Sequence, residues 1–148
     1  MKRSPWVNII ASLFILLFVY TATSKFLDFY SFKSVLKDSP LIRNMSTFVA
    51  WGLPLVEIVI ALLLFFIKTR RIGLWSSLLI MILFTVYLGY MIYFTPHLPC
   101  NCGGVLKEMT WKQHFVFNIF FSALAAFAIW KDKRENSNKT SNVGYKTA

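Results

Sequence analysis

Both cysteines of the chain lie in one short segment, residues 99–104, with the sequence PCNCGG. Cys100 and Cys102 are two positions apart, so their Cα atoms fall within the range of about 4.4–6.8 Å that a disulfide bridges, but the ring closed by a C-x-C disulfide is small and strained. Strain raises the reduction potential and favours exchange over a permanent structural role. The preceding proline restricts φ and the following glycines permit positive φ, which favours a tight turn. The segment therefore favours a redox-active dithiol.

Two other interpretations of this segment stay open. The cysteines could be inert or merely close a loop. Alternatively, His97, Cys100, Cys102 and His114 would offer two sulfurs and two imidazoles, a set acceptable to zinc or copper(I). Structural zinc sites usually have longer cysteine spacings, the chain has no second cysteine pair, and a c-type haem site would need C-x-x-C-H. We therefore prefer the redox interpretation and expect no metal site.

Glu57 is the one charged residue within the apolar run of residues 45–67. A carboxylate at that depth costs at least a few kcal/mol unless it is protonated, paired or placed in a polar cavity, so it indicates a functional site. A protonated Glu57 that fixes helix packing is an equally good interpretation. The polar side chains expected near it are those of Tyr20, Thr21, Thr23, Thr85, Tyr87, Asn118 and Ser122.

His114 and Asn118 are four positions apart, so they share one face of a helix. His114 is also close in sequence to the cysteines, and as a catalytic group it would help to form the nucleophilic thiolate. The simpler interpretation is an interfacial histidine with ordinary hydrogen bonds. Lys25 and Asp28, three positions apart, would form a helix-end ion pair or one edge of the same external site.

The composition indicates that membrane helices position these residues. Of the 148 residues, 57% are hydrophobic and 15% are charged, whereas about a quarter of a soluble domain is charged. A helix of 23 residues is about 34 Å long, enough to cross a hydrocarbon core of about 30 Å. We predict an all-α, antiparallel bundle of four transmembrane helices. Their ranges are about 6–24, 45–67, 72–94 and 111–130. A cleaved signal peptide is the alternative for the first, but the run is long and no clear cleavage site follows it.

The basic residues predict the orientation. Ten of the 16 Lys and Arg lie before the first run, between the second and third, or after the fourth. Of the other six, five lie in the remaining connections and Lys112 lies at the start of the fourth run. The positive-inside rule then places both termini in the cytoplasm of a bacterial inner membrane. Residues 95–110, with the C-x-C turn, would lie in the oxidising periplasm. The net charge of +10 is a topological signal, so we expect the lipid bilayer as a partner and no nucleic acid.

Two further segments have distinct patterns. Apolar and charged residues are interleaved in residues 25–38, which favours a short amphipathic helix on the outer membrane surface. Ser39-Pro40 would end that helix, because proline cannot continue the hydrogen-bond ladder. Residues 135–148 are polar, and we expect a disordered cytoplasmic tail after a membrane domain of residues 1–134.

The order of these features resembles the MauE branch of the DoxX-like membrane proteins over about residues 5–132. The segments that carry the resemblance are Ser24–Phe29 (SKFLDF), Gly52–Glu57 (GLPLVE), Pro99–Gly104 (PCNCGG) and Asn118. The resemblance implies a four-helix membrane protein that assists maturation of methylamine dehydrogenase, whose small subunit is rich in disulfides. DoxX-like relatives are linked to thiosulfate and quinone oxidation and to thiol stress, and the arrangement is similar to vitamin K epoxide reductase.

The chain departs from these relatives in two ways. The family's turn commonly reads C-x-C-F-G, whereas Gly103 replaces the aromatic residue here, which puts a shared partner surface in doubt. Because there is no second cysteine pair, a thiol relay to quinone cannot be completed within the chain. The second dithiol would come from a periplasmic thioredoxin-fold or disulfide-containing partner, and a quinone would be reached only through that partner. No cofactor site is evident in the chain itself.

The sequence thus predicts a component of thiol-disulfide oxidoreductase chemistry. Cys100 and Cys102 would exchange disulfides, His114 would promote the thiolate, and Glu57 with Asn118 would form the polar interior. The alternatives are a non-catalytic assembly factor or small transporter centred on Glu57, and soft-metal binding at His97, Cys100 and Cys102.

Overall fold

The computed structural model describes residues 5–38, 42–94 and 111–144; for residues 111 and 135–144 it describes the backbone alone. All regular structure in these ranges is helical, as the composition predicted, and no strand occurs in them. The elements are α1 (Pro5–Leu27), α2 (Phe29–Asp38), the 3₁₀ turn η1 (Arg43–Met45), α3 (Ser46–Phe65), α4 (Arg70–Phe94) and α5 (Trp111–Gly144).

Within the described ranges, four helical segments are long and apolar enough to cross a membrane: Pro5–Leu27, Arg43–Phe65, Arg70–Phe94 and Lys112–Arg134. Large apolar side chains also cover their outward faces, and Leu16, Phe48 and Val86 are 69%, 79% and 65% exposed. Such surfaces are unfavourable in water and suit a lipid environment. The fold is therefore that of a multi-pass membrane protein, which confirms the predicted fold class.

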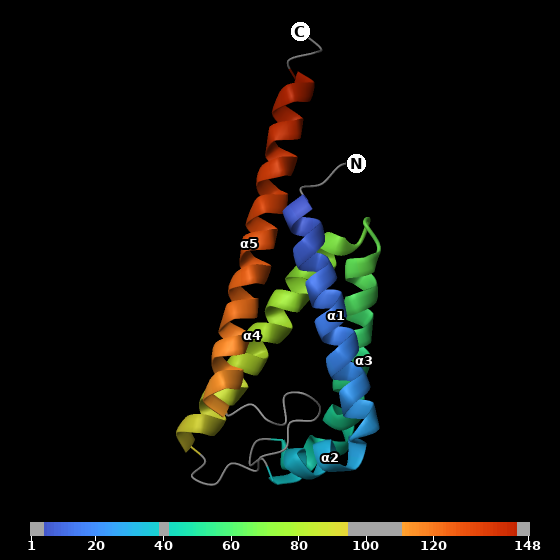
Figure 1. Ribbon diagram of the computed structural model, residues 1–148, viewed down its shortest axis with the longest axis vertical. Coiled ribbons are helices and arrows are strands. Elements are labelled where there is room, and N and C mark those ends of the chain that lie inside the picture. The colour runs from blue at the N-terminus through green and yellow to red at the C-terminus, as the bar shows by residue number, and fades with distance from the viewer. Residues whose placement is uncertain (1–4, 39–41, 95–110, 145–148) are drawn as a thin grey trace.

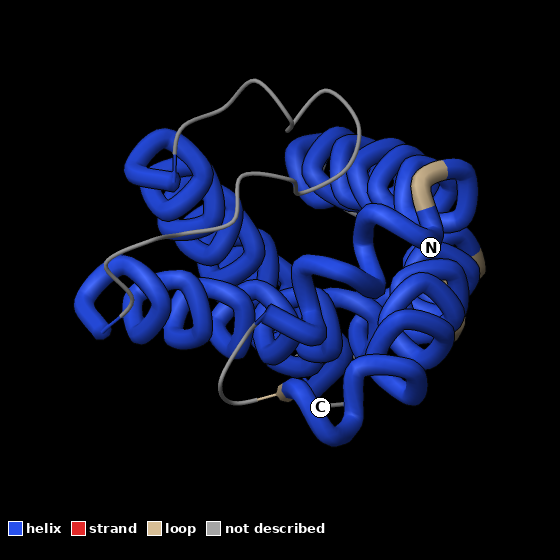
Figure 2. The backbone as a smooth tube through the Cα atoms, turned by 90° about the horizontal axis from the view of Figure 1, so that it is seen from below, coloured by secondary structure: helices blue, strands red, loops and turns tan. Residues whose placement is uncertain are grey.

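The four long helices form two pairs, α1 with α3 and α4 with α5. The pairs meet near the short turn between α3 and α4, and they separate toward the opposite end, where α2 lies across the bundle (Figure 1). Seen from that end, α4 and α5 lie apart from the other helices (Figure 2). The start of α1 and the end of α5 lie at the α3–α4 turn end, so the chain leaves α4 and enters α5 at the α2 end.

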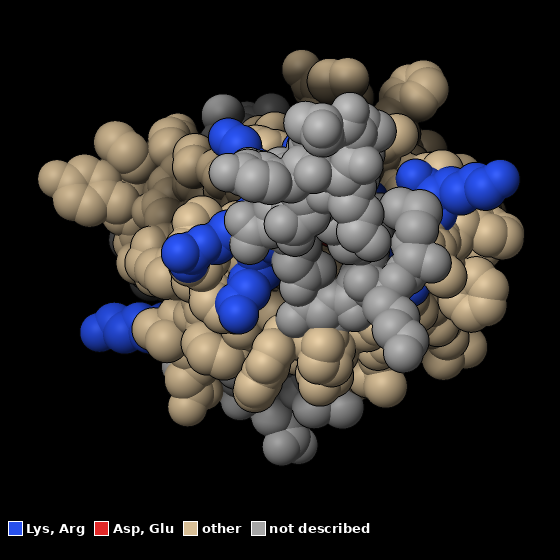
Figure 3. Space-filling model, turned by 90° about the horizontal axis from the view of Figure 1, so that it is seen from above, with Lys and Arg blue, Asp and Glu red and all other residues tan. Residues whose placement is uncertain are grey.

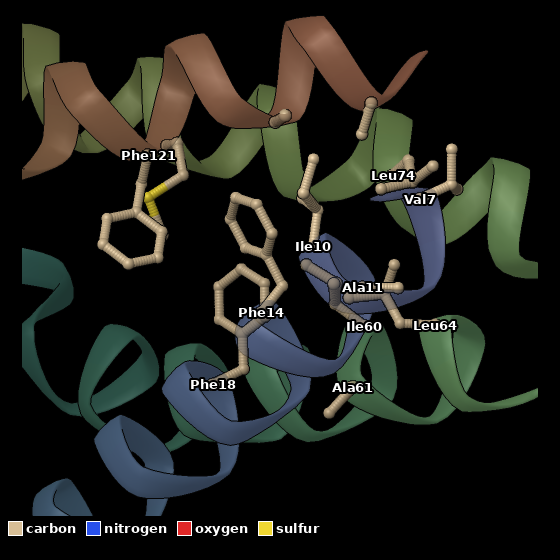
Figure 4. Close-up of a cluster of buried hydrophobic side chains, with 13 residues drawn as sticks. Val7, Ile10, Ala11, Phe14, Phe18, Ile60, Ala61, Leu64, Leu74 and Phe121 are labelled. Atoms are coloured by element: carbon tan, nitrogen blue, oxygen red, sulfur yellow. The ribbon is translucent and has the colours of Figure 1, made fainter. Parts of the chain in front are cut away.

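The core occupies the half of the bundle where the two pairs meet. Phe14 packs edge-on against Phe121, with ring centroids 5.5 Å apart, and joins α1 to α5 (Figure 4). Buried alanines allow the helices to approach closely, as is common between membrane helices, where packing replaces much of the hydrophobic driving force. These alanines are Ala11, Ala61, Ala125 and Ala128.

Gly73 permits a close approach of α3 and α4 near the turn that joins them. A Cβ atom at Gly73 would lie 2.9 Å from the backbone nitrogen of Leu64, so only a residue without a side chain fits. The turn also satisfies carbonyls at the end of α3, which have no partner within the helix. Thr69 Oγ1 donates to the Leu63 carbonyl at 2.9 Å, and Arg70 Nε donates to the Leu64 carbonyl at 3.0 Å.

The predicted amphipathic helix is present as α2. Phe32, Val35 and Leu36 form its buried face, while Tyr30 and Lys37 are exposed. The buried face packs against Ala50 at the start of α3. The helix ends at Asp38, where the sequence predicted a stop before Pro40; residues 39–41 themselves are outside the described ranges.

The end of α5 differs from the expectation. We expected a span of 111–130 and a disordered tail from residue 135, whereas the helix continues to Gly144. Once a helix exists, each added residue gains one backbone hydrogen bond without a new nucleation cost, so a helix can extend past its apolar section. The Asn, Ser and Thr residues of this segment are weak helix formers, but each is less favourable than alanine by only about 0.7 kcal/mol or less.

Basic side chains gather at the end that carries the α3–α4 turn and the start of α1 (Figure 3). Lys68, Arg71, Lys133 and Arg134 are exposed there. Asp132, which is 7% exposed, lies on the same side, and Arg71 Nε is 4.0 Å from its Oδ2. This end therefore carries an excess of positive charge.

Candidate functional site

A buried ion pair joins α1 to α3. Lys25 Nζ lies 2.6 Å from Glu57 Oε1, and the two side chains are 15% and 2% exposed. A charge-assisted contact of this length is stronger than a neutral hydrogen bond. The pair offsets the desolvation that either charge would suffer alone in the interior. The membrane carboxylate that the sequence singled out is therefore matched by a cation.

Local structure sets the position of both partners. Lys25 lies in the last turn of α1, and Glu57 lies inside α3, one turn after the buried Pro54. The rings of Phe32 from α2 and Phe84 from α4 each have their centroid 5.9 Å from Lys25 Nζ. Aromatic faces at this distance attract an ammonium group. Four helices thus hold the ion pair in one place.

The pair lies in the wall of a cavity of about 380 Å³ at the α2 end of the bundle. All five helices contribute to its lining, which is mostly aliphatic and aromatic. The polar side chains in the lining are those of Thr21, Lys25, Glu57, Tyr87, His114 and Asn118. An apolar cavity with a few convergent polar groups is the usual form of a small-molecule site.

Glu57 Oε2 is buried and has no hydrogen-bond partner among the described residues. Two polar side chains of the lining donate to backbone carbonyls of their own helices: Thr21 Oγ1 to the Phe18 carbonyl at 3.2 Å, and Asn118 Nδ2 to the His114 carbonyl at 3.0 Å. A buried acceptor without a donor is costly, and such atoms are uncommon in native proteins. The cavity wall therefore includes one carboxylate oxygen without a described donor.

Comparison with known families supplies the context for this site. A family model described as methylamine utilisation protein MauE matches residues 3–131. The chain belongs to the MauE family. No curated protein and no solved structure matches it significantly. The family match confirms the resemblance found in the sequence and identifies a membrane protein associated with methylamine utilisation.

In this MauE-family protein, three residues from the segments that carried the resemblance meet at the cavity. Lys25 comes from α1, Glu57 from α3 and Asn118 from α5. His114 lies one turn before Asn118 and lines the same cavity, as the four-residue spacing predicted. The similarity in sequence therefore marks residues that are close in space, although they are up to 93 positions apart.

Sequence reasoning missed the contact between Lys25 and Glu57. It assigned Lys25 to a helix-end pair with Asp28 or to an external site, and it sought neutral partners for Glu57. Of those seven candidates, Thr21, Tyr87 and Asn118 line the cavity. The sequence did contain a signal for this contact. A single carboxylate deep in a membrane span needs a cation as its partner, and Lys25 is the basic residue at the end of the preceding span.

The proposed redox segment is outside the described ranges, which exclude residues 95–110 and so His97, Cys100 and Cys102. The described flanks are Phe94 at the end of α4 and Trp111 at the start of α5, both at the α2 end. Within the described part of the chain, no group of three His, Cys, Asp or Glu side chains could hold a metal ion.

Proposed function

We propose that this MauE-family protein exchanges disulfides with a periplasmic partner through Cys100 and Cys102 during methylamine utilisation. Both cysteines are placed by sequence in the 16-residue connection between α4 and α5. The observation that carries the proposal is that this connection begins and ends at the α2 end, where His114 and the Lys25–Glu57 pair line one cavity. The connection that carries the two cysteines is thus attached to the end of the bundle that holds these polar groups.

The exchange has a simple electron balance. A thiolate of the partner attacks one sulfur of the Cys100–Cys102 disulfide, forms a mixed disulfide and releases the other cysteine as a thiolate. A second partner thiolate then displaces the bound cysteine, so that the partner gains a disulfide and the C-x-C pair is left as a reduced dithiol. A second, thioredoxin-fold disulfide protein accepts the two electrons and restores the oxidised pair. His114 is proposed to promote the thiolate form.

The membrane orientation supports this chemistry. We assign the basic end, with Lys68, Arg71, Lys133 and Arg134, to the cytoplasm of a bacterial inner membrane, following the positive-inside rule. The α2 end then faces the periplasm, where disulfides form and persist.

Trapping of a mixed disulfide tests the proposal. In the reoxidation step one cysteine attacks the disulfide of the thioredoxin-fold partner and the other resolves the mixed disulfide. Either Cys100→Ser or Cys102→Ser leaves a single thiol that can attack but cannot resolve, so each variant should accumulate a covalent adduct with that partner in membranes that disappears on reduction. The double variant is the matched control, since it cannot form the bond. If neither single variant yields an adduct and both wild-type thiols stay alkylatable under all growth conditions, the exchange role is wrong.

The cavity itself favours a second candidate, a non-catalytic assembly factor or small transporter centred on Glu57. Its supporting observation is the buried Lys25–Glu57 pair in the cavity wall. Glu57→Gln would then abolish methylamine-dependent growth, while Cys100→Ser/Cys102→Ser would preserve it. The exchange proposal gives the opposite result for the cysteine variant. Stoichiometric copper or zinc that is lost with His97→Ala or either cysteine substitution would instead support a soft-metal role.

A further inference from the structure

The cavity has one polar feature that a ligand could satisfy. Glu57 Oε2 is a buried acceptor without a described donor, while Lys25 Nζ is already engaged by Oε1 at 2.6 Å. An O–H donor that reaches Oε2 would remove the cost of this unpaired atom and form a charge-assisted hydrogen bond. The carboxylate therefore selects for a hydrogen-bond donor.

The volume of the cavity and the residues of its lining indicate the size and the polarity of the rest of the ligand. A volume of about 380 Å³ is within the range of about 300–1,000 Å³ of small-molecule sites, and a single water occupies only about 30 Å³ in the liquid. Phe18, Phe32, Phe84 and Phe117 line the cavity together with aliphatic side chains. The walls fit a mostly apolar body, aromatic rings included.

The charges of the site favour an uncharged ligand. Lys25 already supplies the cation that Glu57 and the rings of Phe32 and Phe84 attract, so an ammonium ligand would be repelled by Lys25. An anion would meet Glu57 Oε2. A neutral hydroxyl avoids both repulsions and still donates the missing hydrogen bond.

Some residues of the cavity lining lie on the side of the bundle that faces the membrane, which suits a membrane-soluble ligand. Leu83 of α4 lines the cavity, and its side chain is 57% exposed. Val49 and Leu53 of α3 lie in the same lining, and α3 and α4 separate toward this end (Figure 1). At least one residue of the cavity lining is thus also part of the outer, membrane-facing surface of the bundle.

We infer that this cavity binds an uncharged, membrane-soluble molecule with an apolar body, whose hydroxyl group donates a hydrogen bond to Glu57 Oε2. The inference uses neither Cys100 nor Cys102, so it holds whether or not the cysteines exchange disulfides.

Three probes with the same ring system test the inference on the full-length protein in lipid nanodiscs, with empty nanodiscs as the partition reference. 2-Naphthol is neutral and donates a hydrogen bond, 2-methoxynaphthalene has no donor, and 2-naphthylmethylamine is an ammonium ion at neutral pH. Saturable binding should be at least about tenfold tighter for 2-naphthol than for 2-methoxynaphthalene, since a hydrogen bond to a charged acceptor is lost. The ammonium probe should bind more weakly than 2-naphthol.

Two variants locate the site. Lys25→Met/Glu57→Leu removes the acceptor without leaving an unpaired charge, so 2-naphthol should lose its preference while 2-methoxynaphthalene still binds, which also reports an intact cavity. Cys100→Ser/Cys102→Ser should bind all three probes as the wild type does. Equal binding of the two neutral probes, tightest binding of the ammonium, no saturable binding above empty nanodiscs, or an unchanged preference in the Lys25/Glu57 variant would each overturn the inference.

Discussion

Lys25 Nζ lies 2.6 Å from Glu57 Oε1, and this contact ties the last turn of α1 to the interior of α3. Both charges were removed from water to make it, so each depends on the other. The pair also lies in the wall of the cavity at the α2 end. It therefore links the stability of the bundle to the candidate site.

Removal of one partner should be more damaging than removal of both. Lys25→Met leaves an uncompensated carboxylate, and Glu57→Leu leaves an uncompensated ammonium; each should cost about 3–5 kcal/mol, as for other buried pairs. The double variant should recover most of this loss. Reversible unfolding in detergent micelles, analysed as a double-mutant cycle, measures the coupling.

Lys37→Met is the control for that cycle, because Lys37 is an exposed lysine of α2. It should change stability by less than about 0.5 kcal/mol. A double variant as unstable as the sum of its two singles would show that Lys25 and Glu57 act independently.

The glycine at the α3–α4 turn gives a second prediction. In Gly73→Ala the new Cβ would lie 2.9 Å from Leu64 N and 3.0 Å from the Leu63 carbonyl carbon, both backbone atoms that cannot turn away. The helices must separate, at a cost of about 1–3 kcal/mol. The same unfolding measurement would detect this loss.

Gly52→Ala is the matched substitution, since nothing lies within 4 Å of a Cβ at Gly52 inside α3. Alanine has the higher helix propensity, so this variant should be as stable as the wild type or slightly more so. Equal effects of the two substitutions would contradict the close approach of α3 and α4 at Gly73.

Two neighbouring arginines should respond differently to substitution by lysine. Arg70 donates through Nε to the Leu64 carbonyl at 3.0 Å and through a terminal nitrogen to Asn8 Oδ1 at 2.5 Å, which joins α1 to the turn. Lysine cannot reproduce this planar, two-direction donation, so Arg70→Lys should cost about 1–2 kcal/mol.

Arg71 is 51% exposed and 4.0 Å from Asp132, a geometry of little energetic value. Arg71→Lys should therefore stay within about 0.5 kcal/mol of the wild type, as judged by thermal unfolding. A larger loss for Arg71→Lys than for Arg70→Lys would show that the turn is held differently.

Orientation can be tested with two introduced thiols in the Cys100→Ser/Cys102→Ser background. Lys37→Cys places a thiol on the exposed face of α2, and Lys68→Cys places one at an exposed position of the α3–α4 turn. The positive-inside rule predicts that a membrane-impermeant maleimide labels the first in intact cells. The second should react only after the inner membrane is opened. The reverse pattern would place the basic end in the periplasm.

The parts of the fold that sequence could predict depend on local composition and periodicity. Apolar length identified the four spans, and interleaved apolar and charged residues over 25–38 predicted the amphipathic helix that the structure shows as α2. Lipid and the membrane interface each impose a pattern on the helix that they contact. The extension of α5 to Gly144 was not predicted, since its last ten residues have no apolar pattern.

The site depends on tertiary geometry, which local patterns do not contain. Glu57 was identified because a lone acid in an apolar run is costly, but its partner comes from 32 positions earlier in the chain. Lys25 could equally have paired with Asp28 by spacing. The cavity lies at the α2 end, where the two helix pairs separate. The sequence of one helix alone does not show that separation. The C-x-C dithiol stays a prediction from sequence.

The redox state of Cys100 and Cys102 in intact membranes tests the exchange proposal most directly. Cells are quenched in acid, free thiols are alkylated with a mass tag, and the tags are counted with and without prior reduction. If exchange occurs, part of the wild-type protein should carry no tag before reduction, and this part should increase when methylamine is the growth substrate. After reduction, all of the protein should carry two tags. Two tags without reduction under every growth condition would contradict the proposed disulfide exchange.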